Sequence, residues 1–228
     1  RVEPSFLREL VGPVVRDECA AATAKMMSWD GKVLNSAGGG MNFHGIGIQR
    51  GYLEPPHPRY DVPARTLFAC GGAMAMRADL YETIGGFDEA FFAYYEDVDL
   101  GWRTWVLGHE VHYCPTAVCY HHHSSTSGRM PREMIRLLQV RNPLLACFKN
   151  YGDEALARVL PAASITARKS FIRVSMLGSS SGSTLSERPV PRLSNRMSRE
   201  KADSRVNSRL KPSSSQWMSR LEMKPGTK

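Results

Sequence analysis

Hydrophobic residues recur at helical spacing directly after Asp97. Four apolar side chains share one face of a helix: Val98, Trp102, Trp105 and Val106. Gly108 follows the last of them, and a glycine at this place is typical of a helix C-terminus. The pattern therefore predicts a helix that carries Glu96 and Asp97 at its N-terminus.

The N-terminal part of the chain shows a helical pattern followed by a strand pattern. Apolar and charged positions alternate at helical spacing over residues 4–17, with an interruption expected near Gly12 and Pro13. Residues 20–29 are small and apolar, which predicts a buried strand. The Asp30-Gly31 pair predicts a turn, and residues 32–37 are expected to form the returning strand.

Residues 38–65 are rich in glycine and proline. This composition predicts a long loop, which we place near the mouth of a site because long loops in compact domains are often functional. The glycines lack the strand–turn–helix context of a nucleotide-binding loop. His44 and His57 are expected to be ordinary loop histidines.

A pair of glycines interrupts the next apolar segment. Residues 66–76 are expected to approach a strand, with Gly71 and Gly72 in the middle. Paired glycines let the backbone come close to a ligand, but a bulge or tight packing explains them equally well. Residues 78–84 predict a short helix that ends at Gly85.

The C-terminal part predicts one more strand and further helices before its character changes. Residues 116–120 read as a strand, and residues 132–147 as helices broken at 141–143, which contain a proline. Residues 168–228 hold 15 serines and almost no apolar period. That composition is typical of a disordered tail, or of a segment read in a shifted frame.

Charge follows the same division. The chain of 228 residues has a net charge of +8, but residues 168–228 carry 14 Lys/Arg against 4 Asp/Glu, and residues 1–167 carry 16 against 18. The basic character belongs to the tail, so it is poor evidence that the folded part binds nucleic acid, and no specific nucleic-acid partner is expected. A tail that binds an anionic polymer or a membrane surface is the alternative function.

The cysteines and the apolar runs limit the compartment. The five cysteines are scattered and odd in number, which favours reduced thiols in a cytosolic protein over a disulfide framework. Neither a transmembrane segment nor a signal peptide is visible in the sequence. We expect a cytoplasmic protein, with peripheral association at the inner face of the cell membrane as a further possibility.

The most distinctive chemistry lies in residues 85–103, which combine aromatic side chains with five carboxylates. Glu96 and Asp97 fall at the start of the predicted helix, where free N–H groups and the helix dipole favour an ionised carboxylate. An ionised carboxylate beside an aromatic-lined cleft suits a general base that acts on a hydroxyl group. An N-cap in a solvated acidic turn is the structural alternative.

Several motifs in fixed order carry a family resemblance. They are FACGGAMAMR at 68–77, IGGFDE at 84–89, FFAYYEDVDLGWR at 91–103, GHEV at 108–111 and PTAVCYH at 115–121. In this order they resemble the C-terminal half of a family 2 glycosyltransferase with the GT-A fold, nearest to its rhamnosyltransferase-like and galactofuranosyltransferase-like branch. The resemblance covers residues 1–165 and implies an α/β fold, a partial GT-A mixed sheet with flanking helices.

The resemblance also implies an activity. Family members transfer a sugar, with inversion, from a nucleotide-diphosphate donor to a hydroxyl of a polysaccharide or glycolipid acceptor. By position, Asp97 resembles the general base, and Glu96 and Asp99 resemble its supports or acceptor contacts. Tyr94 and Tyr95 are candidates for stacking on sugar rings, with simple packing as the alternative for each.

Three more positions are assigned to substrate binding by the resemblance or by residue type. Gly71 and Gly72 lie in the segment that borders the donor sugar in the family. Trp102 is the last candidate, although its place on the apolar helix face favours core packing over a sugar platform.

The leaving diphosphate needs a cation, and the resemblance implies Mg²⁺ or Mn²⁺. His121 resembles the histidine that completes the metal site or contacts the diphosphate, with His123 as the second choice. Cys114 and Cys119 raise zinc as a competitor, but on a strand they would point to opposite faces, and their spacing is unlike that of a zinc finger. A solvated histidine cluster stays open as the third interpretation.

One expected motif is missing. The acidic Asp-x-Asp metal motif of the family should lie just upstream of a segment like residues 1–7, and this sequence does not contain it. We therefore expect residues 1–165 to be the C-terminal part of a catalytic domain and residues 166–228 a disordered tail. Because the chain begins with Arg1, we also expect it to be processed or incomplete, and a non-catalytic remnant is an alternative to an active enzyme.

Overall fold

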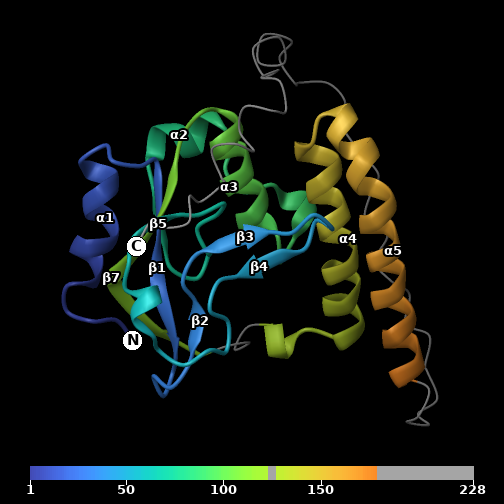
Figure 1. The fold of residues 1–228 in the computed structure, drawn as a ribbon, viewed down its shortest axis with the longest axis horizontal. Coiled ribbons are helices and arrows are strands. Elements are labelled where there is room, and N and C mark those ends of the chain that lie inside the picture. The colour runs from blue at the N-terminus through green and yellow to red at the C-terminus, as the bar shows by residue number, and fades with distance from the viewer. Residues whose placement is uncertain (123–126, 179–228) are drawn as a thin grey trace, which may run out of the picture.

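Two parallel strands, β1 (Ala21–Ser28) and β7 (Val111–His121), form the centre of the sheet in the computed structural model (Figure 1). The structure describes residues 1–122 and 127–178. Within these residues the sheet has five strands; the three shorter ones all pair antiparallel, namely β2 (Leu34–Ser36) and β6 (Met74–Met76) with β1, and β5 (Ala64–Arg65) with β7. The mixed sheet and its flanking helices confirm the predicted α/β fold.

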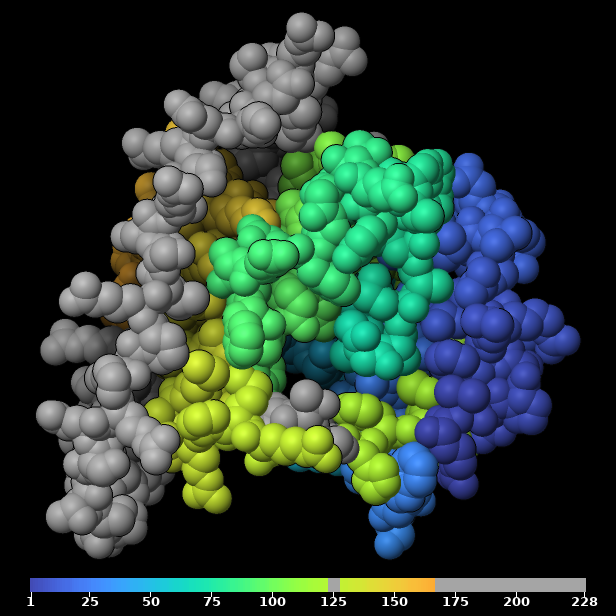
Figure 2. Space-filling view, turned by 180° about the vertical axis from the view of Figure 1, so that it is seen from behind, coloured from blue at the N-terminus to red at the C-terminus, as the bar shows by residue number. Residues whose placement is uncertain are grey.

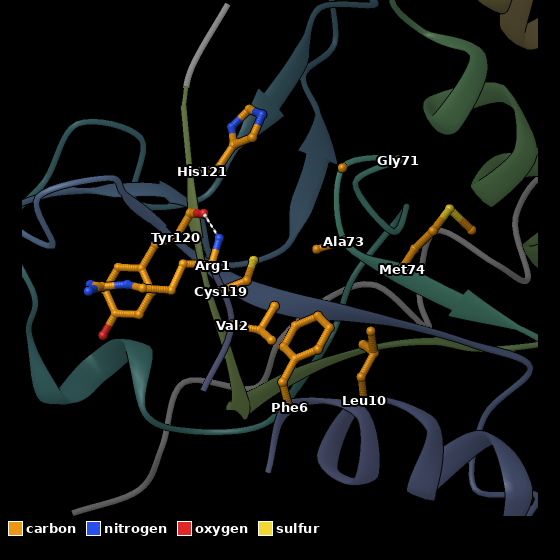
Figure 3. Close-up of a pocket in the computed structure, with 11 residues that line it drawn as sticks. Arg1, Val2, Phe6, Leu10, Gly71, Ala73, Met74, Cys119, Tyr120 and His121 are labelled. Atoms are coloured by element: carbon orange, nitrogen blue, oxygen red, sulfur yellow. Dashed lines mark hydrogen bonds between the residues drawn. The ribbon is translucent and has the colours of Figure 1, made fainter. Parts of the chain in front are cut away.

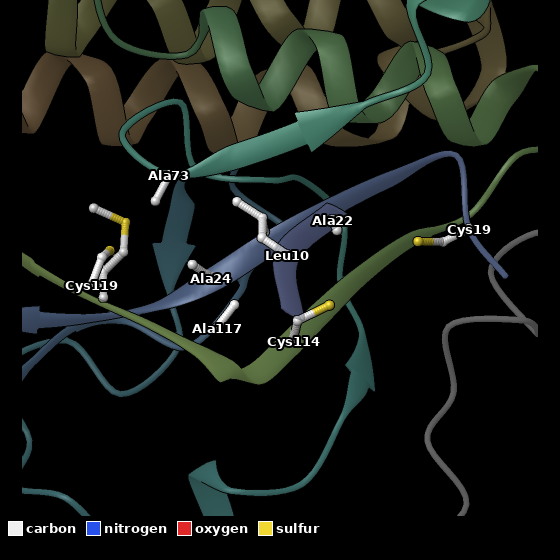
Figure 4. Close-up of a cluster of buried hydrophobic side chains, with 9 residues drawn as sticks. Leu10, Cys19, Ala22, Ala24, Ala73, Cys114, Ala117 and Cys119 are labelled. Atoms are coloured by element: carbon white, nitrogen blue, oxygen red, sulfur yellow. The ribbon is translucent and has the colours of Figure 1, made fainter. Parts of the chain in front are cut away.

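Strand β1 is buried on both faces, as its run of small apolar residues predicts. Ala22 and Ala24 are 0% exposed. Helix α1 (Phe6–Val15) packs Leu10 into the same cluster, and Figure 4 shows it beside alanines of the two central strands. Since alanine side chains are small, the helix can lie close to the sheet. The predicted strands at 20–29 and 32–37 are both confirmed.

Strand β7 contains a bulge that the sequence did not predict. Its register with β1 runs from Ala24↔Cys114 directly to Lys25↔Val118, so residues 115–117 have no partner on β1. Pro115 lies in this bulge, where the absence of its N–H removes no ladder hydrogen bond. The bulge also resets the alternation of side chains. The prediction that Cys114 and Cys119 point to opposite faces is wrong for this reason, because both lie in one apolar cluster.

The predicted long loop at 38–65 is wrong in part. It contains an antiparallel hairpin of β3 (Gly39–Met41) and β4 (Gly47–Gln49), then the short helix η1 (Pro58–Tyr60) and strand β5. Glycine is needed at position 39 because a Cβ there would lie 2.2 Å from Cζ of Phe68. Gly39, one of the glycines that suggested a loop, thus allows close packing of the hairpin on Phe68.

The helices follow the predicted periods but continue through their prolines. Helices α2 (Ala78–Thr83) and α3 (Glu96–Val106) lie where the sequence places them. Helix α1 includes Pro13 and α4 (Arg132–Asn150) includes Pro143, so neither predicted break occurs. Each proline removes one intrahelical bond, and in α4 the burial of Pro143 keeps the helix continuous.

Helices α4 and α5 (Asp153–Gly178) pack against each other beside the sheet (Figure 1). In the reverse view of Figure 2, residues around 70–95, in green, lie between the N-terminal residues in blue and α4 in yellow. Helix α5 runs across the predicted boundary at 165, and residues 179–228 of the predicted tail lie outside the described residues. In the described part of the chain, no helix is both long and apolar enough to cross a bilayer.

Candidate active site

A strained turn leads from the short helix η2 (Glu89–Phe91) into α3. Phe92 has φ 62° and ψ −57°, and the Ala93 N–H donates to the Phe91 carbonyl at 2.7 Å, which defines a γ-turn. Tyr94 and Tyr95 follow with φ of 64° and 74°. Non-glycine residues with positive φ cost about 1–3 kcal/mol each and cluster at functional sites. The strain therefore marks the start of α3 as a candidate site.

Asp97 lies in the first turn of α3, as predicted. The Gly71 N–H donates to its Oδ2 at 3.1 Å, and the Val98 N–H donates to its Oδ1 at 2.8 Å. Burial raises the pKa of the Asp97 carboxyl, while these two N–H bonds lower that pKa. Burial outweighs the helix N-terminus, so Asp97 is a stronger base than a carboxylate in water.

Glu96 is the immediate neighbour of this base. Burial raises the pKa of Glu96, and the adjacent charge of Asp97 raises it further. Its Oε2 atom is buried and has no hydrogen-bond partner among the described residues. Two adjacent carboxyl groups with raised pKa values are typical of sites that move protons.

Gly71 also borders a cavity of about 380 Å³ (Figure 3). Gly72 and His121 line it together with residues from the N-terminal segment, α1, β7, the loop before β6 and β6 itself: Arg1, Val2, Phe6, Leu10, Ala73, Met74, Cys119 and Tyr120. Asp97 does not line the cavity itself but accepts a hydrogen bond from Gly71, which does. The structure thus brings Gly71, Gly72 and His121 to one cavity, with Asp97 hydrogen-bonded to Gly71.

Asp99 has a different place from the predicted one. Its side chain is 0% exposed and lies 2.7 Å from Nη2 of Arg103 and 2.8 Å from Nζ of Lys149. Asn150 donates to its other oxygen at 2.8 Å. With its oxygens held by three side chains inside the protein, Asp99 connects α3 to α4 rather than facing a substrate.

The two predicted aromatic contacts also have structural partners. Trp102 is 1% exposed and packs edge-on against Tyr151, with ring centroids 4.5 Å apart, so it belongs to the core rather than to a sugar platform. The hydroxyl of Tyr95 accepts a hydrogen bond from the Gly47 N–H at 2.8 Å. Tyr95 therefore joins the β3–β4 hairpin to the strained turn.

A complete metal site does not form from the described residues. In residues 1–122 and 127–178, no group of three His, Cys, Asp or Glu side chains lies close enough to hold an ion. His121 would supply a single donor, and His123 lies outside the described residues. The zinc interpretation fails for the same part of the chain, where Cys114 and Cys119 are buried free thiols.

The sequence missed the two residues that hold the strained turn. Asn142 donates from its amide to the carbonyl of Tyr94 at 2.6 Å, and Arg141 donates to the carbonyl of Ala90 at 2.7 Å. The pattern at 141–143 predicts a helix break, and it does not indicate that these side chains bind a distant turn.

The comparison with protein families decides the family. The model of the family described as glycosyltransferase like family 2 matches residues 2–139. The chain belongs to this family. This confirms the resemblance found in the motifs, and the match includes the cavity, the strained turn and the Glu96–Asp97 pair.

Two relatives of this family 2 chain are similar over shorter segments. It is 41% identical over 61 residues to N-acetylglucosaminyl-diphospho-decaprenol L-rhamnosyltransferase of Mycobacterium tuberculosis, which covers 27% of this chain and 20% of the relative. It is 31% identical over 133 residues to O-antigen biosynthesis protein RfbC of Myxococcus xanthus, or 56% of this chain and 10% of that protein. The matches thus span a fifth or less of these curated relatives.

Proposed function

We propose that the chain takes part in transferring a sugar from a nucleotide-diphosphate donor to a hydroxyl group of a saccharide or lipid-linked acceptor, with inversion. The acceptor oxygen attacks the anomeric carbon, the bond from that carbon to the diphosphate breaks, and Asp97 accepts the proton of the hydroxyl group. The products are the glycosylated acceptor, the nucleoside diphosphate and protonated Asp97, which returns the proton to water.

The observation that carries this proposal is the environment of Asp97. Its pKa is raised by burial, which brings its basicity closer to that needed near neutral pH. The Gly71 N–H holds Oδ2 in a fixed orientation, and Gly71 itself borders the cavity. A positioned base of this kind supports proton removal from an acceptor bound beside Gly71.

The donor is expected to lie in the cavity. The backbone at Gly71 and Gly72 is exposed and allows a sugar to approach closely. The family implies Mg²⁺ or Mn²⁺ at the diphosphate, but His121 alone does not make a site, so the other donors would come from outside the described residues.

The acceptor class is proposed from the likeness to the rhamnosyltransferase whose name contains a decaprenol-linked saccharide. A lipid-linked acceptor would place the reaction at the inner face of the cell membrane. By the same likeness, a deoxyhexose such as rhamnose is the first donor sugar to test.

A transfer assay tests the proposal. The full chain is incubated with nucleotide-diphosphate sugars, a lipid-linked saccharide and Mg²⁺ or Mn²⁺, and the product linkage is determined by NMR. We expect an inverted linkage and a loss of about 100-fold or more in Asp97→Asn. The control is Asp79→Asn on exposed helix α2, which should keep full activity. Retention of the donor's configuration, or full activity in Asp97→Asn, would contradict the proposal.

A further inference from the structure

Three of the four residues 92–95, in the turn before α3, have a strained backbone. Phe92 forms the centre of a γ-turn, and Tyr94 and Tyr95 both have positive φ. None of the three is glycine, so the conformation is unfavourable for each of them. Something outside the turn must hold it in this shape.

Asn142 of α4 provides this contact. Its side chain is 0% exposed, and its amide nitrogen lies 3.0, 2.8 and 2.6 Å from the carbonyl oxygens of Phe91, Ala93 and Tyr94. The amide has two hydrogens, so three acceptors share them. A buried amide that binds three backbone carbonyls of one turn fixes the path of that turn.

Arg141 completes the arrangement. Its Nε donates to Oδ1 of Asn142 at 2.9 Å, which orients the amide with its nitrogen toward the turn. Its Nη2 donates to the carbonyls of Ala90 at 2.7 Å and Phe91 at 3.2 Å. Two adjacent residues of α4 therefore bind four carbonyl groups of the segment 90–94.

This segment leads without a break into the first turn of α3. The Asp99 N–H donates to the Tyr95 carbonyl at 2.9 Å, so the orientation of Tyr95 sets the first turn of the helix. Glu96 and Asp97 follow at once, and Asp97 must meet the N–H of Gly71. If the turn relaxed to ordinary backbone angles, the start of α3 would rotate and this bond would be lost.

We propose that Arg141 and Asn142 form a latch that keeps the turn at 91–95 strained and thereby positions Glu96 and Asp97 beside the cavity. Both are positioning residues, since neither borders the cavity. The expected effect on sugar transfer rests on the function proposed above, whereas the expected effect on the conformation of the turn does not.

Hydrogen exchange in the full chain tests the mechanical part. In Asn142→Ala, we expect the amides at 93, 99 and 71 to exchange about tenfold faster or more, because the bonds that hold them depend on the turn. The amides of Leu107 and Gly108, at the other end of α3, should keep their rates. An unchanged rate at 93, 99 and 71 would overturn the latch, as would an equal increase throughout the chain.

Thr104→Ala is the matched control. Thr104 is 0% exposed on α3 and its hydroxyl donates to the Leu100 carbonyl at 2.8 Å, so the substitution removes a buried polar group without touching the turn. It should leave the exchange of residues 93, 99 and 71 unchanged. Equal acceleration by Thr104→Ala would mean that general destabilisation, and not the latch, controls these amides.

A second substitution separates the latch from simple loss of stability. Phe92 is exposed, and glycine adopts its backbone angles without strain. Adding Asn142→Ala to Phe92→Gly should therefore accelerate exchange by a factor at least about three times smaller than the factor that Asn142→Ala produces in the native chain. If Asn142→Ala alone does not fold, the double variant should restore folding. An undiminished effect, or no restoration, would refute the role of strain.

Activity gives the last readout. In Asn142→Ala we expect the transfer kcat to fall about tenfold or more while the Kd for donor stays the same, because the base is displaced and the cavity is intact. A parallel loss of donor binding would contradict a positioning role. A native chain without any activity would defeat the proposed function, yet the exchange results would still decide the latch.

Discussion

Replacing Asp99 tests whether this carboxylate connects helices or binds substrate. Asp99→Asn keeps the shape of the side chain but leaves Arg103 and Lys149 without their shared negative partner. Removing one member of a buried charge network costs about 3–5 kcal/mol. Here Arg103 is 17% and Lys149 29% exposed, and both have other acceptors, so we expect the lower end, about 3 kcal/mol.

Urea denaturation of the full chain measures this cost from the midpoint and the slope. For a protein of this size, about 3 kcal/mol corresponds to a fall of roughly 6–12 °C in Tm. The control is Lys149→Met, which leaves Asp99 paired with Arg103 and should cost only about 1 kcal/mol. A change below about 1 kcal/mol in Asp99→Asn, with a raised acceptor KM, would restore Asp99 to the substrate site.

Two further outcomes follow from packing and from the buried base. Gly101→Ala should destabilise the chain by about 3 kcal/mol or more in the same urea assay, because its Cβ would lie 2.6 Å from the Leu67 carbonyl oxygen and Phe68 Cα. The control is Gly40→Ala, which has open space around it and should cost less than about 1 kcal/mol. Equal costs for the two variants would contradict the close approach of α3 to Leu67 and Phe68. Asp97 has a folded pKa above its ordinary 3.8, so the folded chain binds the proton more tightly and loses stability as pH rises from 3.8 through the folded pKa. Asp97→Asn should therefore be more stable than the native chain at pH 7, and the difference should shrink as pH falls through the folded pKa toward 3.8 and stay constant below it. A difference independent of pH over that window would contradict the raised pKa.

The local patterns of the sequence predicted much of the fold. The small apolar run of β1 and the helical period of α3 lie where residue spacing put them, because burial of these residues requires those elements. The family motifs placed Gly71, His121 and Asp97 in one region. Gly71 joins them in space, because it borders one cavity with His121 and its N–H donates to Asp97.

The remaining features depend on contacts between distant parts of the chain. The Asp99 carboxylate meets Lys149, 50 residues away, and no local pattern shows that pairing. The bulge at Pro115 changed which side chains share a face, so strict alternation gave the wrong answer for Cys119. The role of Asn142 becomes visible only from the backbone angles of the turn, and an aromatic-rich segment does not indicate those angles by itself.

The central claim is that Asp97 is the base of a glycosyl transfer. The most direct measurement compares donor binding with transfer in the native chain and in Asp97→Asn, using calorimetry for the donor Kd and single-turnover kinetics for the chemical step. The account predicts an unchanged Kd and a transfer rate reduced by about 100-fold or more. Transfer at the native rate in Asp97→Asn, or a loss explained entirely by weaker donor binding, would contradict it.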